Sequence, residues 1–205
     1  VKFISNPTRN ELIEYFDKLE EENLIFQETV KQSKETAKLH PDSLNTIRIM
    51  TLIIDGEVKV LPWCAFRMGI GESKVDNASF GGIYCKIEDD GTLSNFAYDA
   101  LGNRFDKHPD GGNFSDVKFD FMDKVKKLVK ESAQRFPHFR LIGWDIAISE
   151  ENEPIIIEAN LTMSGMDVIE TICGPLFGEY TEKVLEEVFL KKHKKKTSMD
   201  ISQYV

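Results

Sequence analysis

Hydrophobic and polar residues alternate along the middle of the chain in the way that β-hairpins require. Residues 46–69 contain two apolar runs around Asp55-Gly56, and residues 80–98 contain two more around Asp90-Gly91. Asp-Gly pairs suit the central positions of a tight hairpin turn. A third pair of apolar runs lies within residues 143–160, on either side of the polar stretch SEENEP. The pattern therefore predicts three antiparallel hairpins.

Helical spacing of apolar residues predicts helices at residues 7–23 and 119–136, and a last helix that starts near Gly178. Thr8 and Glu11 have the spacing of a capping box at the start of the first helix. Short strands are expected at residues 1–4 and 24–30, and a loop at residues 100–116. Strands in the middle with helices beside them predict an α+β fold with a largely antiparallel sheet.

Composition narrows the class of protein. The chain has 205 residues, 41% of them hydrophobic, and a net charge of -9. Such a charge argues against binding to nucleic-acid backbones, although a small anion needs only a local positive pocket. We see no membrane-spanning run or signal peptide and expect a cytoplasmic protein. Cys64, Cys85 and Cys173 lie far apart in the sequence, which predicts reduced, buried thiols.

The third hairpin carries acids within its apolar runs. If its turn is centred between Glu151 and Asn152, Asp145 lies opposite Glu158 and Gly143 lies opposite Asn160. The other face would then be a core face formed by Trp144, Ile146, Ile148, Ile155 and Ile157. Opposed carboxylates repel each other, and a divalent cation removes the repulsion. Carboxylate and amide oxygens suit Mg²⁺, so a metal site is predicted, with two solvent-facing acids as the alternative.

Cationic residues of the neighbouring strands complete a candidate anion site. Arg48 and Arg67 each stand in or at the end of an apolar strand, where a guanidinium needs an anionic partner. A structural salt bridge is the alternative for both. Lys74 lies on a glycine-rich stretch that either closes over a ligand or forms a simple turn. The same stretch carries possible substrate-holding or loop-orienting residues: Asp76, Asn77 and Ser79.

Histidines precede proline at two positions. His108, in the HPDGG stretch, is interpreted first as a turn residue and second as a site residue, and His40 has the weaker claim. The basic tail, residues 191–205, is interpreted as a solvated end, with contact to a membrane surface or a polyanion as the alternative.

Several motifs together resemble one family. The stretches NTIR, AFRMGIGESKVDNASFGG, HPDGG, GWDIAI and IIIEAN, in this order within residues 24–177, resemble the sugar-transfer-associated branch of the ATP-grasp superfamily. This resemblance implies that Asp145, Glu158 and Asn160 hold two Mg²⁺ ions against ATP. It also implies that Arg48 and Arg67 face the phosphates or the acyl group. The residues implied to bind nucleotide are Gln27, Glu28 and Val30 on a hinge strand, Asn45 and Lys74.

The resemblance also implies a reaction. ATP-grasp ligases phosphorylate a carboxylate and let an amine or another nucleophile displace phosphate from the acyl phosphate. In this branch the expected setting is surface polysaccharide (capsule) biosynthesis, with a small carboxylate and an amine or sugar-linked acceptor as substrates. A regulatory domain that binds nucleotide without catalysis and an ATP-dependent phosphotransferase are the alternatives. The oligomeric state is left open.

The smaller lobe of an ATP-grasp fold normally carries a glycine-rich loop and lysines over the phosphates. Before residue 24 we find no such loop, and Lys2 is the only lysine near the right place. We therefore expect a C-terminal portion of a longer enzyme. Residues 1–30 would be a remnant of the smaller lobe with the hinge strand, residues 31–190 the catalytic lobe, and residues 191–205 a basic tail.

Overall fold

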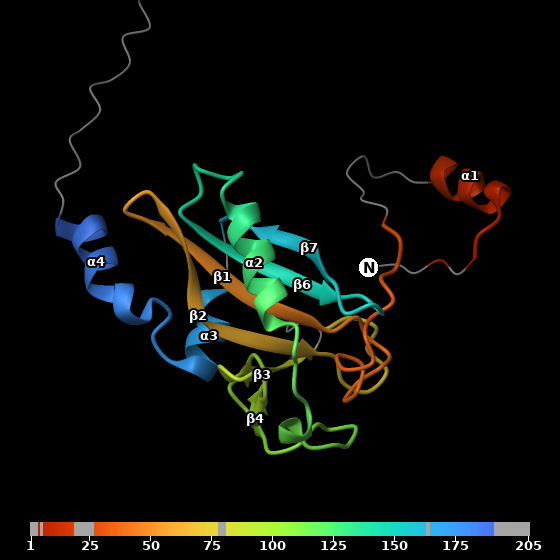
Figure 1. Ribbon diagram of the computed structural model, residues 1–205. Helices are drawn as coiled ribbons and strands as arrows, with labels where there is room; N and C mark the ends of the chain where they lie inside the picture. Colours follow the sequence, from red (N-terminus) through yellow and green to blue (C-terminus); the bar gives the residue numbers. More distant parts are fainter. Residues whose placement is uncertain (1–3, 5, 19–26, 78–80, 163–164, 191–205) are drawn as a thin grey trace, which may run out of the picture.

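A seven-stranded antiparallel sheet forms the centre of the computed structural model (Figure 1). The structure describes residues 4, 6–18, 27–77, 81–162 and 165–190. The strand order is β5-β4-β3-β2-β1-β6-β7. The strands are β1 (Thr46–Ile54), β2 (Glu57–Met68), β3 (Ile83–Ile87), β4 (Leu93–Tyr98), β5 (Arg104–Phe105), β6 (Leu141–Ile148) and β7 (Pro154–Asn160). The predicted α+β class with a largely antiparallel sheet is confirmed.

All three predicted hairpins are present. Asp55 and Gly56 both have positive φ, at 53° and 76°, as the turn between β1 and β2 requires. Gly91 turns the chain between β3 and β4 with a φ of 85°. The first hairpin also contains an irregularity in register between Ile49 and Thr51, and Pro62 lies in the extra segment of β2. Proline has no N–H for the ladder, so a bulge is the place where an inner strand tolerates it.

Helices cover both faces of the sheet. α2 (Met122–Ala133) packs its buried residues on one face, against a core that includes Phe66 and Trp144. α3 (Met166–Cys173) lies on the other face (Figure 1), where Ile169 joins the buried cluster of Met50 and Leu52. Val184 of α4 (Thr181–Leu185) packs against the same cluster. Arg48, Asp145 and Arg67 alternate with the α2-side residues, so their side chains point to the face of α3.

The remaining helical elements are short. α1 (Arg9–Asp17) has the predicted capping box between Thr8 and Glu11, and none of its nine residues is buried. The predicted last helix is present as η3 (Gly178–Tyr180), α4 and η4 (Glu186–Leu190). α3 was not predicted. Its N-cap is Gly165 in the left-handed region without a side-chain hydrogen bond, so the start signal that sequence patterns rely on is missing.

Two expectations about local structure are wrong. Residues 27–30 have no regular secondary structure, so the described half of the predicted hinge strand is not a strand. The loop at 100–116 contains the short strand β5, which pairs with β4, and a turn of helix η2 (Phe114–Asp116). The strand expected at residues 1–4 lies almost wholly outside the described residues. So do residues 24–26 and the tail at 191–205.

The third hairpin corrects the predicted register in part. Asp145 pairs with Glu158 and Gly143 with Asn160, as predicted, but nearer the turn Ile146 pairs with Ile156. The ladder therefore skips Ile157, which is a one-residue β-bulge. The assumed turn centre was wrong by half a residue, and the bulge restores the predicted pairing at the acids. As a consequence Ile156 packs against the core while Ile155 is 38% exposed, contrary to the expectation for Ile155 and Ile157.

Candidate functional site

Arg48 and Asp145 form a buried ion pair at the centre of the sheet. They are direct partners across β1 and β6. The Arg48 guanidinium donates two hydrogen bonds, from Nε to Asp145 Oδ1 at 2.5 Å and from Nη2 to Oδ2 at 3.0 Å. Their side chains are only 11% and 6% exposed. Two parallel bonds in this geometry fix the orientation of both groups.

Arg67 joins the same carboxylate from β2. Its Nη1 donates to Asp145 Oδ2 at 2.9 Å, and its Nη2 lies 3.4 Å from Asp76 Oδ1. Asp76 is held at the start of β1, where Thr46 donates to Oδ2 from its backbone N–H at 3.0 Å and from its hydroxyl. Arg48, Arg67, Asp145 and Asp76 thus form one cluster, which we call the strand cluster.

The two acids of the strand cluster differ electrostatically. Burial tends to raise the pKa of Asp145, but the hydrogen bond from Arg48 and the charges of Arg67 and Arg48 bring this pKa below its usual value. Burial raises the pKa of Asp76 above its usual value, because the charge of Arg67 and the bonds from Thr46 do not offset the lost solvation. The fold therefore favours the ionised form of Asp145 and disfavours that of Asp76.

Glu158 and Asn160 extend the strand cluster towards solvent. Glu158, directly opposite Asp145, is exposed. Asn160 is half-buried, and its amide nitrogen lies 3.3 Å from Gly143 O and 3.5 Å from Asp145 Oδ2. The two arginines thus balance the Asp145 charge that was expected to need a cation. Part of the predicted repulsion between the acids is already relieved by the protein itself.

A cleft of about 770 Å³ opens beside this cluster. The backbone of Gly165 closes over Arg48 so tightly that a Cβ there would lie 2.6 Å from Arg48 Nη1. Gly165 also has a φ of 65°, which favours glycine. The cleft is lined by residues of the β6 start, the β7 end and the α3 start: His138, Phe139, Arg140, Leu141, Leu161, Thr162, Gly165, Met166 and Asp167. No sequence pattern pointed to Gly165, because its role depends on an arginine far away in the chain.

The side chains of Asn45 and Lys74, two of the residues expected to bind nucleotide, contact residues outside the strand cluster. Asn45 is buried, and its amide nitrogen donates to Thr36 O at 2.8 Å and to His40 O at 2.7 Å. Lys74 pairs with Asp42 at 3.1 Å in an exposed position. Gln27 and Glu28 are exposed, and Val30 is half-buried. Their roles towards nucleotide stay predictions.

Other singled-out residues have structural surroundings. Asn77 is exposed, and Ser79 lies outside the described residues. His108 is fully buried within a turn, as its first interpretation predicted, and it lies next to His40 and Asp110. Burial raises the pKa of Cys64, Cys85 and Cys173 to about 12, so these free thiols are poor nucleophiles at neutral pH.

Comparison with known families gives a match over most of the chain. Residues 16–181 match the family described as sugar-transfer associated ATP-grasp. The chain belongs to this family. The ATP-grasp match covers all strands of the sheet and the whole strand cluster. No curated protein and no solved structure matches the chain.

Membership supports ATP-dependent, ligase-like chemistry with ATP and Mg²⁺ as general requirements of the superfamily. Within the part of the chain that the structure describes, the helices are all too short or too polar to cross a bilayer.

Proposed function

We propose that this chain carries the catalytic lobe of an ATP- and Mg²⁺-dependent ligase that joins a carboxylate to an amine or a similar nucleophile. The observation that supports this most is the strand cluster with Glu158 and Asn160 at its edge. It combines two buried guanidinium groups with hard oxygen donors on one face of a sheet. A phosphate site needs guanidinium groups, and a magnesium site needs oxygen donors.

The residues fit Mg²⁺ in chemistry and in placement. Glu158 lies opposite Asp145, and Asn160 lies on the same face two residues further along β7. The Asn160 amide nitrogen faces Asp145 and Gly143 O, which leaves the amide oxygen as the atom that can face a cation. We propose that Asp145, Glu158 and Asn160 hold the metal, with Glu158 as the most accessible ligand. Bound there, Mg²⁺ would screen the negative charge of the phosphate groups during transfer.

Arg48 and Arg67 would serve the phosphates or the acyl group. Arg67 makes its long contact of 3.4 Å to Asp76, an acid whose ionised form the fold disfavours. A phosphate oxygen can replace this contact at lower cost than the shorter one to Asp145, because the fold stabilises the ionised form of Asp76 less than that of Asp145. Arg48, bound through two nitrogens to the Asp145 carboxylate and covered by Gly165, would mainly position Asp145.

The reaction follows the chemistry of the superfamily. An oxygen of the substrate carboxylate attacks the γ-phosphorus of ATP, ADP leaves, and an acyl phosphate forms. The nitrogen of the acceptor then attacks the acyl carbon, inorganic phosphate leaves, and the nitrogen loses its proton. We propose surface polysaccharide biosynthesis as the setting. The cleft beside Gly165, which is lined by apolar and charged residues, is our candidate place for the acceptor.

Calorimetric titration of ATP with and without Mg²⁺ tests the metal assignment in the full-length gene product. We expect Glu158→Gln to weaken Mg²⁺-ATP binding at least tenfold, because it removes an exposed ligand without disturbing a buried contact. Glu150→Gln, on the same hairpin and also exposed, is the matched control and should bind as the wild type does. Equal affinity of the two variants would show that Glu158 holds no metal.

Product analysis tests the reaction class. A ligase yields ADP, inorganic phosphate and an amide when a carboxylate and an amine are supplied together. A phosphorylated product that accumulates in the presence of amine would identify a phosphotransferase instead. Nucleotide binding without turnover of any carboxylate would favour a regulatory domain.

A further inference from the structure

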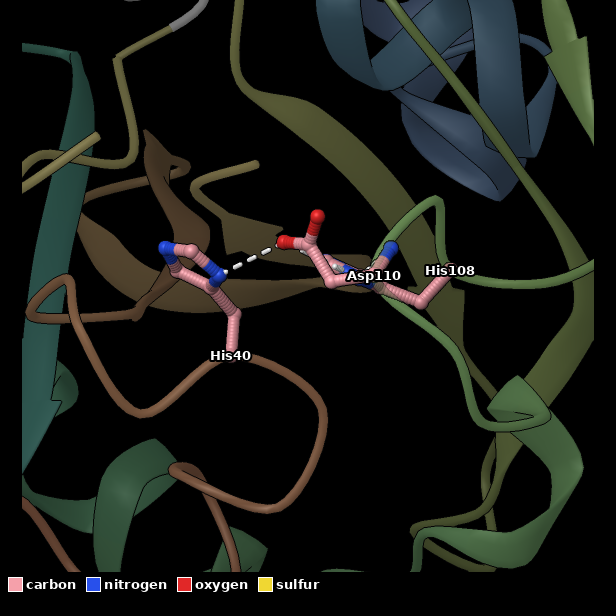
Figure 2. Close-up of side chains that lie close together, drawn as sticks. All are labelled: His40, His108 and Asp110. Atoms are coloured by element: carbon pink, nitrogen blue, oxygen red, sulfur yellow. Dashed lines mark hydrogen bonds and ion pairs between the residues drawn. The ribbon is translucent and has the colours of Figure 1, made fainter. Parts of the chain in front are cut away.

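The buried residues His40 and His108 and the exposed Asp110 form a second polar group, which we call the loop cluster (Figure 2). Each residue offers one ligand atom, and these atoms lie within 4.8 Å of one another. His40 and His108 are 2% and 0% exposed, and the Asp110 side chain is 36% exposed. His40 comes from the connector before β1, and His108 and Asp110 come from the loop after β5, so two segments far apart in the sequence converge here.

The outer nitrogens of both imidazoles face backbone carbonyls. His40 Nε2 lies 3.1 Å from Ser73 O, and His108 Nε2 lies 3.0 Å from Gly69 O. A carbonyl oxygen only accepts hydrogen bonds, so each Nε2 carries the proton that it donates. In the neutral ring this leaves the lone pair on Nδ1. Metal-binding histidines show this arrangement, in which the second nitrogen donates to a carbonyl and thereby fixes the ring.

The inner nitrogens face one carboxylate. His40 Nδ1 lies 2.9 Å and His108 Nδ1 3.8 Å from Asp110 Oδ2. Figure 2 shows the Asp110 carboxylate beside the His40 ring. Asp110 Oδ2 also accepts from Gly71 N–H at 2.8 Å, and His108 Nδ1 accepts from Asp110 N–H at 3.2 Å. Two acceptor atoms 2.9 Å apart need either a shared proton or a cation between them.

We propose that His40 Nδ1, His108 Nδ1 and the Asp110 carboxylate bind a transition-metal ion, with Zn²⁺ as the best fit. Zn²⁺ takes imidazole and carboxylate ligands at about 2.0–2.1 Å in a tetrahedron, which sets neighbouring ligand atoms about 3.3 Å apart. The observed separations of 2.9 and 3.8 Å lie on either side of this value. Water completes the set from the exposed side of Asp110. Two imidazoles select against Mg²⁺, so this site is distinct in its chemistry from the one at Glu158.

The bound ion would act as a clamp on the loop between β2 and β3. Gly69, Gly71 and Ser73 of this loop all contact the loop cluster through their backbones. The same loop carries Asp76, which contacts Arg67. Metal binding would therefore fix the loop that leads into the strand cluster. This inference does not rest on the proposed ligase activity.

Competition titration with a chromophoric chelator tests the site on chelator-treated protein. We expect one Zn²⁺ per chain for the wild type, and at least tenfold weaker binding for Asp110→Asn. This variant keeps the shape of the side chain and removes its charge. Because Gly71 N–H and His40 Nδ1 both contact Oδ2, the amide keeps one of these two hydrogen bonds. Asp106→Asn, an exposed acid on the same loop, is the matched control and should bind Zn²⁺ as the wild type does.

A wild type without a stoichiometric site, or equal affinity of the Asp110 and Asp106 variants, would overturn the proposal. If Asp110→Asn fails to fold by circular dichroism, X-ray absorption of the Zn²⁺-loaded wild type decides. A first shell of nitrogen and oxygen with imidazole scattering supports the loop cluster. Sulfur in the first shell would assign the ion to a cysteine and contradict it.

Discussion

The strand cluster and the loop cluster both contain a carboxylate beside buried nitrogen-bearing side chains, yet their side chains are held in place by different means. Arg48, Arg67 and Asp145 lie on three adjacent strands, where the ladder sets their positions. His40, His108 and Asp110 lie outside the regular strands and are placed by hydrogen bonds to turns. In the first cluster the counter-charges are supplied by the protein. In the second, the Nδ1 atoms and the carboxylate are all acceptors.

This difference indicates what each cluster contributes. Removing the Asp145 charge takes away a buried counter-charge that Arg48 and Arg67 both bind directly, so the cluster is coupled to the stability of the sheet. Removing the Asp110 charge takes a hydrogen-bond acceptor away from two imidazole nitrogens that are themselves acceptors. We therefore expect the loop cluster to affect ligand binding more than the stability of the fold.

The sharpest test of the comparison is the pair Asp145→Asn and Asp110→Asn. We expect Asp145→Asn to lower the free energy of unfolding by about 3–5 kcal/mol, because Arg48 and Arg67 lose their buried counter-charge. For Asp110→Asn in chelator we expect a loss below about 1 kcal/mol. Urea unfolding followed by circular dichroism measures both. Equal losses would remove the distinction between the clusters.

The hairpin register, on which the strand cluster depends, can be tested with two isoleucines. Ile156→Ala should cost about 2 kcal/mol, since this side chain packs against the core. Ile155→Ala should cost less than about 1 kcal/mol, since Ile155 is 38% exposed. Chemical denaturation of the two variants side by side measures the difference. The reverse order would mean that the bulge at Ile157 is not formed.

The two clusters should also differ, by a smaller amount, in how their contributions to the free energy of unfolding depend on pH. The pKa of His108 is lowered in the fold, so its contribution to stability is present above the unfolded value of about 6.5 and is lost as the pH falls. The pKa of Asp145 is also lowered, so its contribution is present above about 3.9 and is lost only in stronger acid. Urea unfolding in chelator from pH 7 to pH 4 should show a decline that His108→Gln reduces. An identical decline in this variant would assign the pH response elsewhere.

The sequence was sufficient to predict the hairpins, since alternation and Asp-Gly turns are local signals. It also predicted the pairing of Asp145 with Glu158, although the one-residue bulge that makes this pairing possible could not be found from alternation. The sequence indicated that Arg48 and Arg67 need anionic partners, but no local pattern indicated that both would bind Asp145. The contact between His40 and Asp110 joins loops 70 residues apart. The periodic spacing of apolar residues, which predicts strands and helices, does not predict the conformation of loops. α3 was not predicted, because its N-cap residue is a glycine, which has no side chain to mark the start of the helix.

Because of the bulge at Ile157, the register of the strand pairs next to the turn differs by one residue from the register at Asp145 and Glu158. In an uninterrupted hairpin, one residue more or less in the turn would shift the opposing strand against Asp145 and exchange Glu158 for a hydrophobic neighbour. Here β7 already contains one residue without a pairing partner on β6, Ile157, between the turn and Glu158. Loss of that residue can compensate for a turn that gains one. The turn of this hairpin is therefore free to change length during evolution or engineering while the acidic pair stays in register.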